Sequence, residues 1–417
     1  MVLSSFWESL KTLSKAKYLT RNVKTICMSE LLNDVGHSGF NPSLPVFYTL
    51  LGATPLQYGF IEGISSFFGI AFTAPAGELA DRIGRRKPIY AGFLMMALSR
   101  FLVALSASFW LLMPFRFLNR FGRSVRYAAR DPLLAESVTP ETRGMAYAVY
   151  QLMDNMGSFI GPILTIVILD KVGQTLGSIR NIFLLASVPT FIAALLSYLY
   201  ITDTLKVKRR SMKERISFLT KVRRLVKNKN LLRFTGVTCL FTPFGPDYKF
   251  AILYATHGPL KVSLIMTTLL YFVHEAVSVI ASLPAGRLVD RVGRKFTVSL
   301  SIILYILGML TVVISFYFLT NIFVLAIAFA FLGLYDTFFS VSRRPFVADS
   351  ASSEDRGMVM AAYSTLHGVC SESIAPIIAG FLFFAVSPVA PFVTALVVSI
   401  IATFLLTWLV SEPRRVV

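Results

Sequence analysis

Three ionisable side chains follow one face of the first long apolar segment of this chain. Glu30, Asp34 and His37 are four and three residues apart, so a helix places them on one side, and Asn41 extends the row. At the centre of a membrane helix a charged side chain costs about 2.5 to 3.5 kcal/mol, so such residues are typical of functional sites. A carboxylate removed from water attracts cations and can take up and release protons. The row therefore predicts a site for cations or protons.

Other apolar segments carry ionisable residues of the same kind. The second contains Glu62, the fifth Asp154, and the later segments contain Asp247, Lys249, His274, Glu275, Asp336, His367 and Glu372. Arg116 and Arg120 in the fourth segment, together with Lys249, are the basic residues available to pair with them. Glu30 and Arg116 therefore have a second interpretation, as members of ion pairs within the membrane.

A metal site is the less favoured interpretation of these residues. His274 beside Glu275 could ligate a divalent ion together with the row in the first segment. Adjacent residues on a helix, however, point about 100° apart, so the two do not face one ion. Cys27, Cys239 and Cys370 form no paired spacing, and neither a disulfide nor a structural zinc site is expected. We expect no metal and no other cofactor.

The composition places these residues in a membrane. The 417 residues are 55% hydrophobic and only 15% charged, and the mean hydropathy is +0.66. About a quarter of the residues of a soluble globular protein are charged, so a water-soluble fold is excluded. Apolar runs of about 20 residues cross the hydrocarbon layer as helices. Twelve are predicted, at 24–48, 56–79, 88–106, 108–128, 144–169, 180–201, 232–256, 262–285, 295–317, 320–341, 357–385 and 389–410.

Basic residues gather on alternate connections between these segments. They are Lys11, Lys15, Lys17 and Arg21 before the first segment, Arg82, Arg85, Arg86 and Lys87 after the second, and Arg123, Arg126, Arg130 and Arg143 around the end of the fourth. The opposite connections near 50–55, 106–108, 318–320 and 386–389 contain no Lys or Arg. The bias predicts a multi-pass protein of the cell membrane with both termini cytoplasmic. The net charge of +19 is thus assigned to topology, and no nucleic-acid partner is expected.

The chain repeats itself at half its length. Pro75-Ala-Gly-Glu-Leu-Ala-Asp-Arg-Ile-Gly-Arg85 recurs as Pro284-Ala-Gly-Arg-Leu-Val-Asp-Arg-Val-Gly-Arg294, with eight of eleven positions identical. Arg130-Asp-Pro-Leu-Leu-Ala-Glu-Ser137 recurs as Arg343-Arg-Pro-Phe-Val-Ala-Asp-Ser350. Six segments per half give both halves the same orientation, related by an axis along the membrane normal, with a cavity between them.

The repeat and the charge pattern divide the chain into five parts. We predict an N-terminal arm at 1–22, a six-helix bundle at 23–202, a basic linker at 203–230, a second bundle at 231–411 and a tail at 412–417. The linker contains eleven Lys or Arg residues, and its Ile216, Leu219, Val222 and Leu225 recur at helical spacing. This pattern predicts an amphipathic helix on an anionic lipid surface.

The doubled loop carries a family resemblance. Its pattern Gly-x-Leu-x-Asp-Arg-x-Gly-Arg, followed by Arg or Lys, is similar to the signature between helices 2 and 3 and between helices 8 and 9 of the major facilitator superfamily. Ser29-Glu30, Asp34, Ile61-Glu62-Gly63, Arg130-Asp131 and Met153-Asp154-Asn155 resemble a prokaryotic branch of largely unassigned substrate. The resemblance covers residues 22 to 411 approximately. It implies an all-α membrane protein with twelve transmembrane helices in two pseudo-symmetric six-helix bundles, working by alternating access.

The loop residues have a structural and a gating interpretation. Gly77 permits close helix contact, Gly84 permits the turn, and Asp81 can cap a helix or pair with an arginine. The resemblance implies that Asp81 engages the opposite half and gates the protein, with Asp290 as its counterpart. The candidate gating residues are Gly77, Asp81, Arg82, Gly84, Arg85, Arg86, Arg130, Asp290, Arg291 and Arg294. In the alternative interpretation the arginines only determine topology.

The fifth segment contains a packing motif. Gly157 and Gly161 are four residues apart, which allows a tight helix contact, and Pro162 kinks the helix. Gly157-Ser-Phe-Ile-Gly161-Pro162 also resembles a motif of many proton-driven exporters of the superfamily. The resemblance thus implies export as well as packing.

The expected function is secondary active transport, most simply proton-coupled antiport that exports an organic cation, a hydrophobic compound or a metabolite. The candidate residues for substrate or protons are Glu30, Asp34, His37, Glu62, Arg116, Asp154, Asp247, His274 and Glu275, with Asp34 and Asp154 the leading proton sites. Proton-coupled uptake of a metabolite or of an organic anion at Arg116 is the alternative, and export of a divalent metal is less favoured.

Other classes of protein fit less well. No Gly-x-x-x-x-Gly-Lys-Ser/Thr loop is present for a nucleotide, so an ion gradient must supply the driving force. A membrane enzyme needs a polar catalytic cluster in its loops, which are short here, and a receptor would be expected to lose the gating loops. Two halves suffice for a cavity, so a monomer in the lipid bilayer is expected.

Overall fold

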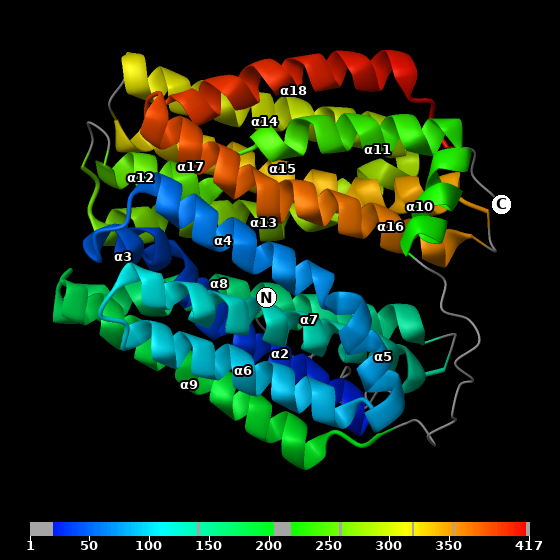
Figure 1. Cartoon of the computed structure of the whole chain (residues 1–417), viewed down its shortest axis with the longest axis horizontal. Helices are drawn as coiled ribbons and strands as arrows, with labels where there is room; N and C mark the ends of the chain where they lie inside the picture. The colour runs from blue at the N-terminus through cyan, green and yellow to red at the C-terminus, as the bar shows by residue number, and fades with distance from the viewer. Residues whose placement is uncertain are drawn as a thin grey trace, which may run out of the picture.

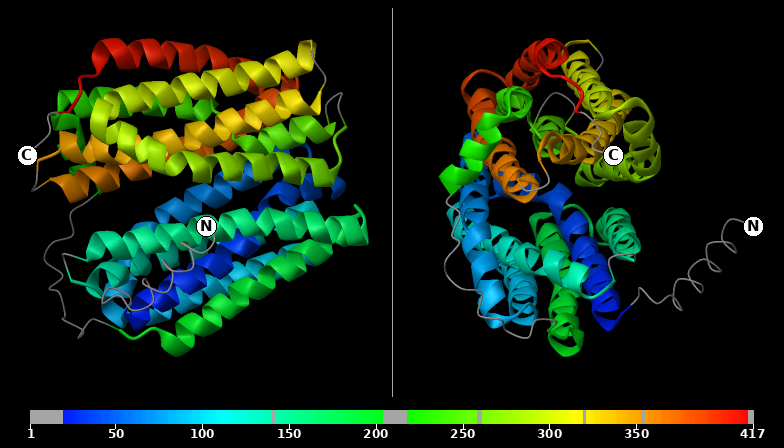
Figure 2. Two further views of the ribbon diagram at one scale, coloured as in Figure 1. Left: turned by 180° about the vertical axis from the view of Figure 1, so that it is seen from behind. Right: turned by 90° about the vertical axis from the view of Figure 1, so that its right-hand side faces the viewer.

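The computed structural model describes residues 20–139, 142–203, 218–257, 261–318, 321–352 and 355–413. These residues are almost entirely helical and contain no strand. The helices form two bundles that lie one above the other in Figure 1, with α2 to α9 in the lower bundle and α11 to α18 in the upper one. The two views of Figure 2 show the same division.

The N-terminal bundle consists of eight α-helices and two short 3₁₀ turns within the described residues. In chain order they are α2 (Arg21–Phe40), η1 (Asn41–Ser43), α3 (Leu44–Leu50), α4 (Pro55–Ala71), α5 (Thr73–Ile83), α6 (Arg86–Ala104), η2 (Phe109–Leu111), α7 (Leu112–Glu136), α8 (Arg143–Val172) and α9 (Leu176–Tyr200).

The C-terminal part follows the same plan after the described part of the linker. It contains α10 (Phe218–Lys227), α11 (Lys229–Phe241), η3 (Thr242–Phe244), α12 (Tyr248–His257), α13 (Leu264–Val292), α14 (Arg294–Tyr317), α15 (Ile322–Ser350), α16 (Arg356–Gly368), the π-helical turn η4 (Val369–Ile374), α17 (Ala375–Ala385) and α18 (Ala390–Leu409).

Eight helices of the described chain are long and apolar enough to cross a membrane, by length and composition. They correspond to eight of the twelve predicted segments. The other four segments are shorter or more polar. Three are interrupted, at η1, at Phe72 and at η3, and the fourth, α7, carries five arginines. When the interrupted pieces are joined, each predicted segment has a helical counterpart.

The first helix of each half is broken at a corresponding place. A proline lies in each break, Pro42 in η1 and Pro243 in η3, where it removes a backbone donor and interrupts the α-helix. In transporters built from repeats, interrupted helices at matching positions of the two halves mark the binding region. This signal was present in the sequence as Asn41-Pro42-Ser43 and Thr242-Pro243-Phe244.

The two bundles touch closely at the end that carries the loop between α3 and α4. A Cβ atom added to Gly59 would lie 2.0 Å from the carbonyl oxygen of Pro376, and one added to Gly380 would lie 2.5 Å from that of Pro55. Only glycine allows α4 and α17, which are adjacent in Figure 1, to approach this closely. At the same end the side chain of Gln174 accepts a hydrogen bond of 3.2 Å from the amide of Ile265. This end of the molecule is therefore closed.

The linker helix α10 differs from the prediction in its environment. Leu225 is buried in one apolar cluster with Leu231 and Val359, and Val222 packs against that cluster. The apolar face of α10 thus covers α16 of the protein instead of lipid, because it completes a protein core that α11 and α16 leave open. Ile216 lies outside the described residues, as does the side chain of Leu219.

Candidate functional site

Glu30 lies at the centre of an ion-pair cluster inside the N-terminal bundle. Arg126 of α7 donates a hydrogen bond to one of its carboxylate oxygens, and Arg130 Nη1 lies 3.4 Å from the other. Arg130 also donates to the hydroxyl of Tyr150 on α8, so the cluster joins three helices. Because Glu30 and Arg126 are buried, each depends on the other for its charge to be tolerated.

Asp34 lies one helical turn from Glu30 and meets Asp154 of α8. Carboxylate oxygens of Glu30, Asp34 and Asp154 all lie within 4.8 Å of one another. Asp34 is only 7% exposed, and its Oδ2 has no hydrogen-bond partner among the described residues. Asp154 is half-buried and accepts a hydrogen bond of 3.1 Å from Gln151. The structure thus brings together the two residues predicted as leading proton sites.

A proton suits this cluster better than a metal ion does. Three carboxylates at such distances are able to hold a cation. However, the guanidinium groups of Arg126 and Arg130 already lie at both oxygens of Glu30 and repel a second cation there. Two carboxyl groups in contact, Asp34 and Asp154, are instead typical of a pair that shares a proton.

Glycines of α8 make this contact with α2 possible. A Cβ atom at Gly157 would lie 2.5 Å from the carbonyl oxygen of Leu31 and 2.9 Å from the Cβ atom of Asp34. One at Gly161 would lie 2.5 Å from the carbonyl oxygen of Val35. Pro162 follows within the same continuous helix. The motif therefore packs α8 onto the helix that carries Asp34.

A second ion-pair network joins the two halves. Arg116 of α7 binds Glu62 of α4 with both ends of its guanidinium, at 2.6 and 2.7 Å, and Tyr48 donates to the same carboxylate at 3.2 Å. Arg120 lies 3.6 Å from Glu62 and 3.0 Å from Glu372. Glu372 belongs to the π-helical turn η4 of the other bundle, and such turns are frequent at functional sites. Glu62 and Arg116 are thus a buried pair, as the alternative interpretation of Arg116 predicted.

His37 does not join Glu30 and Asp34. Its Nε2 atom lies 2.9 Å from the amide nitrogen of Asn41, across the break between α2 and η1. The row predicted from sequence spacing is therefore divided: its first two members face Asp154, and its last two bond to each other.

In the C-terminal bundle, His274 of α13 is the hub of another polar cluster. Its Nε2 atom lies 2.9 Å from Asp336 of α15, and its Nδ1 atom lies 3.5 Å from Glu275. The rings of Tyr248 and Tyr271 lie 5.2 and 6.0 Å from its own ring. His274 is buried, but the side chain of Asp336 is 54% exposed at the middle of a long apolar helix. An exposed carboxylate at that depth faces water instead of lipid.

Asp247 lies in the non-helical residues after η3. It accepts a hydrogen bond of 3.0 Å from the amide of Lys249, and its other oxygen lies 3.3 Å from the ammonium of the same residue. Its side chain is 44% exposed. Asp247 and Asp336 therefore offer accessible carboxylates near Tyr248.

The doubled loop is held in an equivalent way in both halves, by two carboxylates to which the sequence pattern assigned no role. Asp203 accepts hydrogen bonds from the amides of Arg85 and Arg86 at 2.6 and 2.9 Å, at the N-terminus of α6. Glu412 accepts bonds of 2.6 and 2.7 Å from the amides of Arg294 and Lys295 at the N-terminus of α14. A carboxylate at a helix N-terminus is favoured by the helix dipole and by the free amides.

Each loop also has an ion pair within its own half. Arg85 lies 3.3 Å from Glu136, and Arg294 lies 3.0 Å from Asp349. Glu136 and Asp349 occupy matching positions in the second repeated motif, which was the signal for this pairing. The left-handed turns that position the amides are Gly84, with φ of 90°, and Gly293, with φ of 119°.

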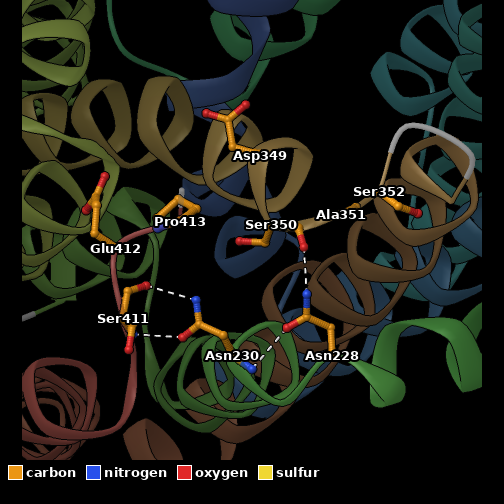
Figure 3. A pocket seen from close by; sticks show the side chains of 9 residues that line it. All are labelled: Asn228, Asn230, Asp349, Ser350, Ala351, Ser352, Ser411, Glu412 and Pro413. Carbon is orange, nitrogen blue, oxygen red and sulfur yellow. Dashed lines mark hydrogen bonds between the residues drawn. The ribbon is translucent and has the colours of Figure 1, made fainter. Parts of the chain in front are cut away.

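Figure 3 shows the C-terminal corner, where a pocket of about 370 Å³ lies between Asn230, Ser411 and Glu412. The side chain of Asn230 exchanges two hydrogen bonds with the backbone of Ser411, at 2.7 and 2.9 Å. Asn22 exchanges two bonds of 2.9 Å with the backbone of Thr202 in the other half. The corner is thus a repeated scaffold.

The remaining candidate gating residues are placed as follows. Arg82, Asp290 and Arg291 are exposed, and the side chain of Asp81 lies outside what the structure describes. A Cβ atom at Gly77 would meet Ala128 at 3.9 Å, an ordinary contact, so the close approach predicted at Gly77 is not found in this conformation.

Comparisons with known proteins agree with this architecture. The family model of the Major Facilitator Superfamily matches residues 26–260 and 250–417. An uncharacterized MFS-type transporter of Methanocaldococcus jannaschii is 26% identical over 396 residues, which are 94% of this chain and 95% of that protein. The uncharacterized MFS-type transporter YcaD of Escherichia fergusonii is 24% identical over 69% of this chain and 72% of its own length.

Two solved structures share the fold. A bacterial homolog to the human lysosomal transporter Spinster, inward-facing and unoccupied, has a TM-score of 0.71 at 15% identity and covers 96% of this chain and 100% of that one. A mutant of the nucleoside transporter NupG has a TM-score of 0.76 at 14% identity, with 94% and 100% covered. The predicted twelve-helix fold in two bundles is confirmed. The chain belongs to the major facilitator superfamily and is a multi-pass membrane protein and a secondary transporter.

Proposed function

We propose that this transporter is a proton-coupled antiporter that exports an organic cation, with a hydrophobic compound or a metabolite of similar charge as the wider class. The observation that carries the proposal is the contrast between two kinds of carboxylate. Asp34 is buried beside Asp154, and its Oδ2 has no hydrogen-bond partner among the described residues, whereas the side chains of Asp336 and Asp247 are 54% and 44% exposed.

Asp34 and Asp154 are the proposed proton carriers. Asp154 is half-buried while Asp34 is nearly closed off, so a proton can reach the pair from the more exposed member. Gly157 holds α8 against α2 at this point, so movement of α8 changes the environment of both carboxyl groups. A carboxyl pair whose environment changes during the cycle can bind a proton on one side and release it on the other.

The accessible carboxylates of the C-terminal half are the proposed cation site. Asp336, Glu275 and Asp247 lie around the rings of Tyr248 and Tyr271, whose centroids are 4.8 Å apart with the ring planes tilted by 33°. Aromatic faces and carboxylates together recognise organic ammonium groups. The uptake alternative is supported less well, because Glu62 already occupies Arg116 with both oxygens and leaves it unavailable to an anion.

The proposed cycle starts from an inward-facing state. The charge bias assigns the connection between α3 and α4 to the outside and the basic corners to the cytoplasm. The closed end is the one with the α3–α4 connection, which supports a state whose interior opens toward the cytoplasm. The contact between Arg120 and Glu372 joins the halves in this state.

The proposal also covers the location, the oligomeric state, the division of the chain and the gating residues. They are the cell-membrane location with both termini cytoplasmic, the monomeric state, the five-part division at residues 22, 202, 230 and 411, and the gating roles of Asp81 and Asp290.

The test uses the purified protein in liposomes with an acidic lumen and a pH-sensitive dye inside. Tetraethylammonium, ethidium, divalent cations and small carboxylates are added outside in turn. We expect an organic cation to raise the luminal pH, and Asp34→Asn or Asp154→Asn to abolish the response. Asp170→Asn, an exposed residue on the same helix as Asp154, is the matched control. If proton flux is seen only with anions, which then move in the same direction as the protons, the protein is an uptake symporter and the antiport proposal is wrong.

A further inference from the structure

A fully buried arginine lies in the N-terminal bundle, and it belongs to neither the Glu30 nor the Glu62 ion-pair cluster. Arg100, in the last third of α6, is 0% exposed. Its hydrogen bonds go to Asn33 and Thr190, and its Nε atom has no partner among the described residues. A buried guanidinium without a nearby negative charge is strongly destabilising, so Arg100 must have a counter-charge.

The hydrogen bonds of Arg100 lead to Asp34. Arg100 Nη1 and Nη2 donate to the backbone oxygen and the side-chain oxygen of Asn33, at 3.2 and 3.1 Å. The amide nitrogen of Asn33 then donates to Oδ1 of Asp34 at 3.0 Å. Since the Asn33 oxygen faces the cation and its nitrogen faces the carboxylate, the amide dipole is aligned between the two charges.

The space for Arg100 is built into the helix packing. A Cβ atom at Gly36 would lie 2.8 Å from Arg100 Nη1 and 2.2 Å from the backbone oxygen of Ala186. Only glycine leaves room there, one turn from Asn33 on the same helix. Thr190 of α9 accepts a further hydrogen bond from the guanidinium. Three helices thus hold Arg100 in one orientation.

Several charged groups surround Asp34, and Arg100 is the cation that a path of hydrogen bonds connects to it. On its own helix, Glu30 precedes it and His37 follows it. α8 presents Asp154 and Tyr150, α7 presents Arg123, Arg126 and Arg130, α6 presents Arg100, and α9 presents the uncharged Thr190. Arg123 lies over the ring of Tyr127. Arg126 and Arg130 are both bonded to Glu30, so Arg100 is the arginine whose hydrogen bonds lead to Asp34.

We propose that Arg100 is the fixed counter-charge of Asp34, connected through the Asn33 amide, and that this connection sets the pH range in which Asp34 exchanges its proton. Arg100 is thus a positioning residue: it acts on the proton through Asn33 and does not contact the substrate. The proton role of Asp34 rests on the function proposed above, but the charge pairing does not.

The pairing is tested by a thermal-stability cycle that requires no transport. The melting temperatures of the protein in detergent are measured for Asp34→Asn, Arg100→Gln and the double variant. Each single change leaves one charge buried without its partner, so both should lower the melting temperature. The double variant should melt above Arg100→Gln, because it removes the orphaned charge as well. Additive losses in the double variant would overturn the pairing.

The effect on protons is tested by the pH profile of dye-detected transport. Removing a positive charge makes Asp34 hold its proton more firmly, so Arg100→Gln should move the half-maximal pH upward by about one unit. Arg100→Lys should restore the profile. Thr190→Val, which removes a bond of Arg100 but leaves Asn33 in place, should not shift it. An unchanged profile in an active Arg100→Gln protein would refute this part of the proposal.

The stability cycle and the transport assay distinguish a failure of the proposed function from a failure of the inference about Arg100. If the unmodified protein shows no proton-coupled flux, the proposed function fails while the stability cycle still decides whether Arg100 and Asp34 are paired. If flux is present and the cycle is additive, the inference about Arg100 fails alone.

Discussion

The two halves of this transporter treat their carboxylates in opposite ways. In the N-terminal half, Glu30 and Glu62 are buried and each is held by two arginines. In the C-terminal half, Asp336 and Asp247 are about half exposed and pair with a histidine and a lysine. A buried Arg–carboxylate pair is costly to break, whereas an exposed carboxylate can exchange partners. The contrast indicates that these carboxylates of the N-terminal half are fixed in place, and it is the basis for the cation site proposed in the C-terminal half.

The corners formed by the doubled loop show no such difference. Asp203 and Glu412 accept the same two backbone amides at the start of α6 and α14, and Glu136 and Asp349 bind equivalent arginines. The corners therefore retain the repeat in atomic detail, while the interiors have diverged.

The largest effect is expected where the N-terminal half is most tightly paired. Glu62→Gln leaves Arg116 buried without its bidentate partner and should destabilise the protein by about 3 to 5 kcal/mol. Thermal unfolding in detergent measures the loss. The double variant Glu62→Gln with Arg116→Met should recover much of it. A Glu62→Gln protein as stable as the original would remove the basis for the contrast between the halves.

An intermediate effect is expected from the corresponding change in the C-terminal half. Asp336→Asn removes an exposed charge, so the melting temperature should change little, by the equivalent of about 1 kcal/mol or less. Transport of the organic cation should instead fall at least tenfold, with the loss mainly in KM. A large loss of stability with unchanged KM would mean that Asp336 is structural like Glu62.

The smallest effects should be equal in the two corners. Asp203→Asn and Glu412→Gln each weaken a carboxylate at a helix N-terminus and should cost about 1 kcal/mol. Thermal unfolding compares them directly, with Asp170→Asn as an exposed control. If the losses of unfolding free energy in the two corner variants differ by more than twofold, the two corners are equivalent in geometry but not in energy.

Sequence patterns predicted the elements better than the contacts between them. The Glu30–Asp34 spacing indicated a shared helix face, and the structure adds Asp154 to it from α8. The same pattern included His37, which bonds Asn41 one helical turn further along instead of joining the carboxylates. Asp336 was visible as an ionisable residue in a membrane segment, but nothing along the chain indicated that His274 is its partner. Arg100 was overlooked although a lone arginine in the third apolar segment was a clear signal.

The sequence alone determined the membrane environment, the twelve segments, the duplication and the family, because these depend on hydropathy, charge placement and local spacing. Only the tertiary structure decided which charges meet: Glu62 with Arg116, His274 with Asp336, and Asp203 with the loop before α6. The physical reason is that a buried charge is stabilised over a few ångströms, and its partner lies on another helix at a sequence distance that no local pattern encodes.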